Sequence, residues 1–120
     1  MPKPGRPPKA ALYARVFSPD ARGVLHLDAD TQLERLRGVA ESMRAGIVGE
    51  YIDHDPTEEG TPQLARAVRD LYKSGSLIVH DTYRLGGTRA AACWAEVLRP
   101  RGIRLVYAMH EPEPDAEATK

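Results

Sequence analysis

Apolar runs alternate along the chain with stretches in which apolar residues recur every three or four positions. The runs are rich in Leu, Ile, Val and Tyr and predict four strands, at 11–17, 47–53, 76–80 and 103–109. The periodic stretches predict three helices: one capped by Asp30 or Thr31 and ended by Gly46, one over 62–73 and one over 88–99. Strands and helices therefore alternate, as they do in βαβ units.

This order predicts an α/β fold of three layers, with helices on both faces of a mostly parallel sheet of four to five strands. The run "SLIVH" is apolar throughout, which is typical of a strand buried on both faces. Sites in such sheets lie at the carboxyl ends of the strands. We therefore expect functional residues in the segments that follow them, at 17–20, 53–60, 80–88 and 109–110.

Composition divides the chain into three parts. We expect a disordered head at residues 1–10, which is basic and rich in proline. The folded domain is expected at residues 11–110, and a disordered acidic tail at residues 111–120. The sequence contains neither an apolar stretch long enough to span a membrane nor a signal peptide, and we expect a cytoplasmic protein. The single cysteine, Cys93, excludes an internal disulfide, and its apolar helical surroundings predict a buried thiol.

Charge gives no sign of a partner at the level of the whole chain. Seventeen basic and seventeen acidic residues give a formal net charge of zero, so no overall field attracts the protein to nucleic acid. The head is an exception, because Lys3, Arg6 and Lys9 lie there among prolines and glycine without an acid. Such a segment is similar to a single AT-hook, which contacts the minor groove of DNA, and it is equally typical of a disordered terminus.

Two arginines are the candidates for phosphate binding. Arg15 lies inside an apolar strand, where its charge needs an acid or a phosphate as a partner. Asp53 or Asp81 could supply a structural partner, and that alternative stays open. Arg84 follows the third strand, at the same edge of the predicted sheet. A pair of converging arginines suits a phosphodiester, because the planar guanidinium binds phosphate oxygens through two hydrogen bonds.

Ser18 is the candidate nucleophile, on weaker grounds. Strand alternation places Tyr13, Arg15 and Phe17 on one face of the first strand and Ser18 on the other. The four histidines show no metal-binding spacing, and the acidic loop after Asp53 is more typical of a solvated turn than of a metal site. We expect neither a metal nor a cofactor.

The ordered series "YARV", "QLERL", "EYID", "SLIVHDTYRLGGT" and "LRPRGIRLVY" resembles the catalytic domain of serine recombinases, the resolvase/invertase family, over residues 11–109. The resemblance implies DNA cleavage and rejoining through a phosphoserine link, with arginines stabilising the transferred phosphate. It also implies that Arg15 and Arg84 are two of these arginines, and that Gln32 and Asp53 are supporting residues.

Several positions depart from the family's pattern. Phe17 stands where the family has its nucleophilic serine, and Ser18 follows one residue later. Two further arginines of the family are missing, because the matching positions are Gly87 and Thr61 or a near neighbour. The sequence ends at Lys120, so we expect neither the long helix nor the DNA-binding domain that usually follow, and a homo-oligomer would need another surface.

These departures predict a catalytically impaired recombinase-like domain that acts by binding DNA or a recombinase partner. Two alternatives stay open. The first is an atypical active serine recombinase that uses Ser18, and the second is a protein-interaction module with no role on DNA.

Overall fold

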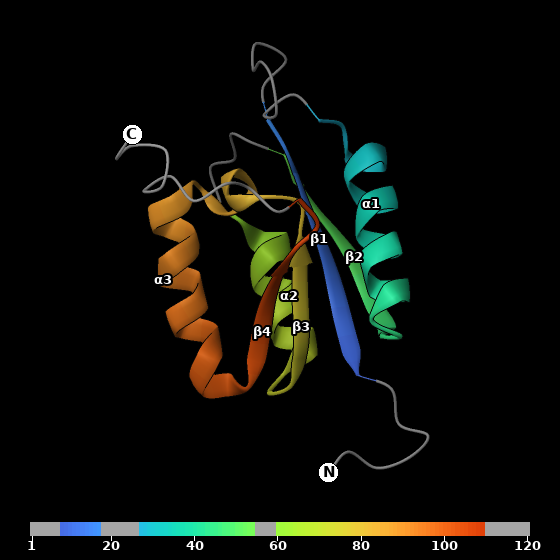
Figure 1. Cartoon of the computed structure of the whole chain (residues 1–120). Helices are drawn as coiled ribbons and strands as arrows, with labels where there is room; N and C mark the ends of the chain where they lie inside the picture. The colour runs from blue at the N-terminus through green and yellow to red at the C-terminus, as the bar shows by residue number, and fades with distance from the viewer. Residues whose placement is uncertain (1–7, 18–26, 55–59, 110–120) are drawn as a thin grey trace, which may run out of the picture.

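The computed structural model describes residues 8–17, 27–54 and 60–109 (Figure 1). The sequence-based predictions for Ser18, Lys3, Arg6 and the tail at 111–120 lie outside these ranges, as does most of the acidic loop after Asp53.

The described elements follow the predicted order of strands and helices. They are β1 Lys9–Val16, α1 Ala29–Ser42, β2 Gly46–His54, α2 Pro62–Leu71, β3 Gly75–Val79, the short 3₁₀ helix η2 Thr82–Leu85, α3 Thr88–Leu98, a second short 3₁₀ helix η3 Arg99–Arg101, and β4 Ile103–Tyr107. β1 begins at Lys9, two residues before the predicted start, so Lys9 and Ala10 belong to the sheet and not to the head.

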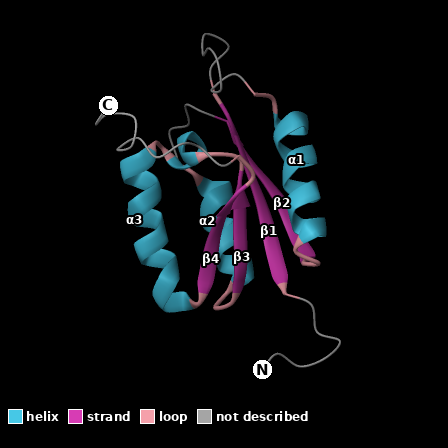
Figure 2. Ribbon diagram, in the orientation of Figure 1, coloured by secondary structure: helices cyan, strands magenta, loops and turns pink. Residues whose placement is uncertain are grey.

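The four described strands form one parallel sheet in the order β2-β1-β3-β4. Figure 2 shows α1 on one side of the sheet and α2 and α3 on the other, which confirms the predicted three-layer α/β fold. Alternate residues of β1 supply both layers of the core: Leu12 packs in the cluster with Leu36 of α1, and Tyr13 packs in the cluster with Leu64 of α2.

The start of α1 differs from the prediction of a cap at Asp30 or Thr31. Asp28 is the N-cap, because its backbone is extended and its carboxylate accepts a hydrogen bond from the Thr31 backbone N–H at 2.7 Å. Asp30 lies in the first turn, where a negative charge interacts favourably with the helix dipole.

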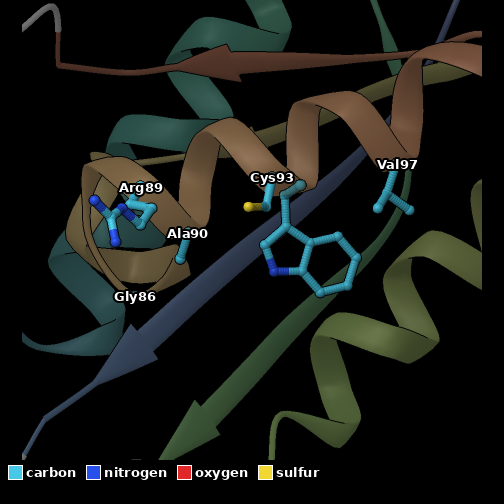
Figure 3. A pocket seen from close by; sticks show the side chains of 6 residues that line it. Gly86, Arg89, Ala90, Cys93 and Val97 are labelled. Atoms are coloured by element: carbon cyan, nitrogen blue, oxygen red, sulfur yellow. The ribbon is translucent and has the colours of Figure 1, made fainter.

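The prediction of a buried Cys93 is wrong, because the thiol is exposed. α3 buries Ala91 and Leu98 against the sheet. Cys93 lines a shallow open pocket on the helix together with Trp94 and Val97 (Figure 3).

Among the described residues, no helix has the length and apolar character needed to cross a membrane.

A buried tyrosine joins β2 to α2. The Tyr51 hydroxyl donates a hydrogen bond to Asp70 Oδ2 at 2.7 Å. Burial, followed by this hydrogen bond to a carboxylate, raises the pKa of Tyr51 from 10.0 to about 12. Folding therefore favours the protonated phenol.

We expect the free energy of unfolding to fall as the pH rises from 10 towards about 12, because only the unfolded state releases the Tyr51 proton readily in that range. Tyr51→Phe should reduce this pH dependence, while Tyr72→Phe, at an exposed tyrosine, should leave it unchanged. Urea unfolding at a series of pH values measures both. Equal pH dependence in wild type and Tyr51→Phe would contradict the assignment.

Candidate functional site

The candidate site lies where the strands end, and its first feature is a glutamine that replaces a neighbouring strand. Pairing of β1 with β3 stops at Tyr13 and Val79. Beyond that point, Gln32 of α1 accepts a hydrogen bond from the Arg15 backbone N–H at 3.1 Å and donates one to the Arg15 carbonyl at 3.0 Å. The side-chain amide thus satisfies the backbone groups of β1 as a peptide group would. Gln32 also donates to the Leu27 carbonyl at 2.8 Å, which fixes the approach to α1.

Arg84 provides the second feature. Its side chain is completely buried, and its Nε donates to Asp81 Oδ2 at 3.2 Å while Nη1 donates to the Arg15 carbonyl at 3.1 Å. Asp81 is equally buried and also caps η2 by accepting from the Tyr83 backbone N–H at 2.9 Å. A buried guanidinium is tolerated only with a charged partner, and Asp81 provides it.

A buried histidine extends this network to α1. His80 Nδ1 lies 2.7 Å from Asp81 Oδ2, and His80 Nε2 lies 2.8 Å from Arg35 Nη1. Because an arginine can only donate, Nε2 must be the acceptor, which assigns the ring proton to Nδ1 and the Asp81 carboxylate as its acceptor. Arg35, His80, Asp81 and Arg84 therefore form one connected chain of hydrogen bonds.

Asp53 has a different task. Its carboxylate, 4% exposed, accepts hydrogen bonds from the backbone N–H groups of Gln63 and Leu64 at 3.0 Å each. Thr61 is the residue before α2 but makes no side-chain cap, so the acid at the end of β2 serves as the cap from a neighbouring element. Asp53 Oδ2 also accepts from the Tyr13 hydroxyl at 2.9 Å.

Phe17 joins the two candidate arginines. The guanidinium carbons of Arg15 and Arg84 each lie 5.3 Å from the centroid of its ring, within the range of cation–π contacts. Phe17 therefore lies beside Arg15, as the alternation of side chains along the strand predicts. An aromatic ring at this place stabilises both cations, but it carries no atom that can attack a phosphate.

The structure brings some of the predicted site residues together and separates others. Arg15, Arg84 and Gln32 meet at the end of β1, and Asp53 is the register partner of Arg15 on the neighbouring strand β2, with its carboxylate bonded to the start of α2. Lys9 lies at the opposite end of β1. Within the described ranges, no group of three or more His, Cys, Asp or Glu residues could hold a metal ion.

Sequence reasoning missed the roles of His80 and Arg35. The dipeptide His80–Asp81 directly after an apolar strand was a usable signal, because polar residues at that position lie at the carboxyl end of the sheet. Arg35 gave no such signal, because it lies on α1, far from His80 in the sequence. Its contact with His80 depends on how α1 packs on the sheet.

A four-stranded parallel sheet between helices, with two arginines and a supporting glutamine at the end of its first strand, is the arrangement that the resemblance implies for a serine recombinase catalytic domain. Two solved structures are similar to it. The C-terminal catalytic domain of ISC1926 TnpA, an IS607-like serine recombinase, has a TM-score of 0.64 and 20% identity, over 92% of this chain and 74% of that one. The N-terminal catalytic domain of TP901-1 integrase has a TM-score of 0.63 and 22% identity, over 83% and 77%.

The family comparison is more specific than the structural one. The profile of the family described as "Resolvase, N terminal domain" matches residues 10–120. The chain therefore belongs to the resolvase family of serine recombinase domains. No curated protein matches it.

Removal of Asp81 should strongly destabilise the fold. We expect Asp81→Ala to lower the free energy of unfolding by about 3–5 kcal/mol, because it leaves the buried Arg84 without a counter-charge. Arg84→Met should also destabilise the protein, but the double variant should lose less than the sum of the two. Urea unfolding of the four proteins tests this, and strictly additive losses would show that the two residues act independently.

Proposed function

We propose that this resolvase-family domain takes part in site-specific DNA recombination without cutting DNA, and that it acts by binding DNA or a recombinase partner. The observation that carries this proposal is the Phe17 ring, which lies 5.3 Å from the guanidinium carbons of both Arg15 and Arg84. By the resemblance, Phe17 holds the position of the attacking serine. The site thus has an aromatic ring where the reaction needs a hydroxyl.

The state of the arginines supports the same proposal. Phosphoryl transfer depends on donors that point at the transferred group. Arg84 is completely buried and directs two donor groups at protein oxygens, those of Asp81 and Arg15. By the resemblance, Gly87 and either Thr61 or a near neighbour stand where the family has two further arginines, and each lost donor costs roughly 10²–10³-fold in rate.

The proposed contact with DNA is made by Lys3 and Arg6 of the basic head together with Lys9, the first residue of the sheet that follows it. Of these, Lys9 is described, and it is exposed at the first position of β1. A soluble DNA-binding domain of this kind would work in the cytoplasm, alone, as a homo-oligomer or beside an active recombinase.

Ser18 remains the basis of a second candidate function, because it directly follows Phe17 in the sequence and both arginines of the pair, Arg15 and Arg84, are in place. An atypical active recombinase would form a phosphoserine link to DNA through this residue. The two functions differ in one product, the covalent protein–DNA adduct.

We expect no covalent adduct when the wild-type protein is incubated with supercoiled or nicked DNA and separated on a denaturing gel. Ser18→Ala should behave identically. An adduct formed by the wild type and lost in Ser18→Ala would overturn catalytic impairment, and Phe17→Ala, which keeps Ser18, is the control for a general disturbance of the site.

We expect Arg6→Ala to weaken DNA binding and to reduce the slope of log Kobs against log salt by about 0.9, the value for one phosphate contact on duplex DNA. Arg66→Ala, at an exposed arginine of α2, is the matched control. Fluorescence anisotropy with a labelled A·T-rich duplex measures both. Binding that is undetectable, or independent of salt, would favour an interaction module with no role on DNA.

A further inference from the structure

Four basic residues lie at the end of the sheet where the strands begin, opposite the candidate recombinase site. Lys9 is the first residue of β1. Arg44, Lys73 and Arg101 each lie two residues before the first residue of the strand that follows them, β2, β3 and β4 respectively. We call these four residues the basic row.

The strand register places the basic row at one level. Lys9 is paired with Gly46, Ala10 with Ser76, and Gly75 with Ile103, so the first residues of all four strands are aligned. The sheet order then gives the order of the row as Arg44, Lys9, Lys73 and Arg101. Neighbouring strands lie about 4.8 Å apart, so the row extends over about 14 Å.

Close backbone contacts join the segments that carry the row. The Gly46 N–H donates to the Pro8 carbonyl at 2.7 Å. A Cβ on Gly75 would lie 2.8 Å from the Lys9 carbonyl oxygen, and one on Gly102 would lie 2.9 Å from the Lys73 carbonyl oxygen. Figure 1 shows the same end of the molecule, where β1 begins and the helices lead into the next strands.

The charges of the basic row face solvent. All four residues are exposed, and none forms an ion pair with a carboxylate in the described part of the chain. Lys73 lies over the exposed ring of Tyr72, 5.1 Å from its centroid. The nearest acids along the chain are Glu41, in the last turn of α1, and Asp70, which accepts hydrogen bonds from Tyr51 and Arg69.

Helix dipoles explain part of this pattern. Arg44, Lys73 and Arg101 follow the C-terminal ends of α1, α2 and α3, where a positive charge interacts favourably with the helix dipole. No helix in the described part of the chain precedes Lys9, however, and in the sequence Lys9 continues the basic head with Lys3 and Arg6. Stabilisation of the helix ends therefore does not account for the row as a whole.

We propose that the basic row binds the phosphate backbone of DNA as a continuation of the basic head. A row of about 14 Å covers about four intervals of about 3.4 Å along the duplex axis, which is enough to contact several successive phosphates of one strand. Such a contact does not depend on the DNA sequence. It involves no contact between DNA and the Arg15 and Arg84 region at the far end of the strands. This inference rests on the proposed DNA-binding function.

The test compares three triple variants with the wild type in binding to a short labelled duplex between about 50 and 200 mM salt. In Arg44→Gln/Lys73→Gln/Arg101→Gln we expect affinity at the lowest salt to fall about tenfold or more, and the slope of log Kobs against log salt to become shallower by about 2–3. Arg37→Gln/Arg66→Gln/Arg69→Gln removes the same charge from the outer surfaces of α1 and α2 and should bind nearly as the wild type does. Arg44→Lys/Lys73→Arg/Arg101→Lys keeps the charge and should also retain binding.

Thermal unfolding of each variant separates binding from stability. If the first triple variant does not fold, the three single glutamine variants replace it, each expected to reduce the slope by about 0.9. Equal binding by the first two triple variants would overturn the basic row and leave the proposed function intact, even if the helix ends lost stability. A wild-type protein without salt-dependent binding, including Arg6-dependent binding, would overturn both.

Discussion

The buried ion pair of Arg84 and Asp81 is the interaction on which the end of the sheet depends. A guanidinium with no exposed surface requires a charged partner, and Asp81 provides it while it also caps η2 and accepts from His80. With its charge balanced, Arg84 can donate to the Arg15 carbonyl and hold β1 beyond the point where it leaves β3. Gln32 completes this support from α1. The arginines that the resemblance assigns to phosphate binding, Arg15 and Arg84, are bonded to each other in this chain.

The two ends of the sheet consequently differ in character. At the carboxyl end, arginines have protein oxygens and an aromatic ring as neighbours, so a phosphate would have to compete with contacts that the fold itself requires. At the amino end, basic side chains reach solvent and have no described carboxylate as an ion-pair partner. Under the proposed function, a domain of this family that does not cut DNA retains affinity for DNA through the second end, since backbone binding needs exposed charge and not a built site.

Much of the fold could be predicted from the sequence, because apolar periodicity reports directly which side of a strand or helix is buried. The strands, the helices and the convergence of Arg15 and Arg84 all followed from that pattern and from the parallel order. The contacts of Gln32 with Arg15, of Asp53 with Tyr13 and of His80 with Arg35 could not be predicted in this way, since each joins residues far apart in the chain and depends on how the helices pack on the sheet. The cap at Asp28 was missed because Asp30 and Thr31, two and three residues later, are also capping residue types. The exposure of Cys93 was missed because the residues next to it in the helix are apolar.

The proposed function and the basic row together place DNA at the amino end of the sheet and not at the recombinase-like site. Side-chain Nε–H signals of arginines in an NMR titration with a short DNA duplex test this placement directly, with each signal assigned by an Arg→Lys substitution. We expect shifts for Arg44 and Arg101, while the signals of Arg15 and Arg84 stay in place because those side chains remain bonded within the protein. Shifts of Arg15 and Arg84 with no change at Arg44 and Arg101 would contradict this placement of DNA.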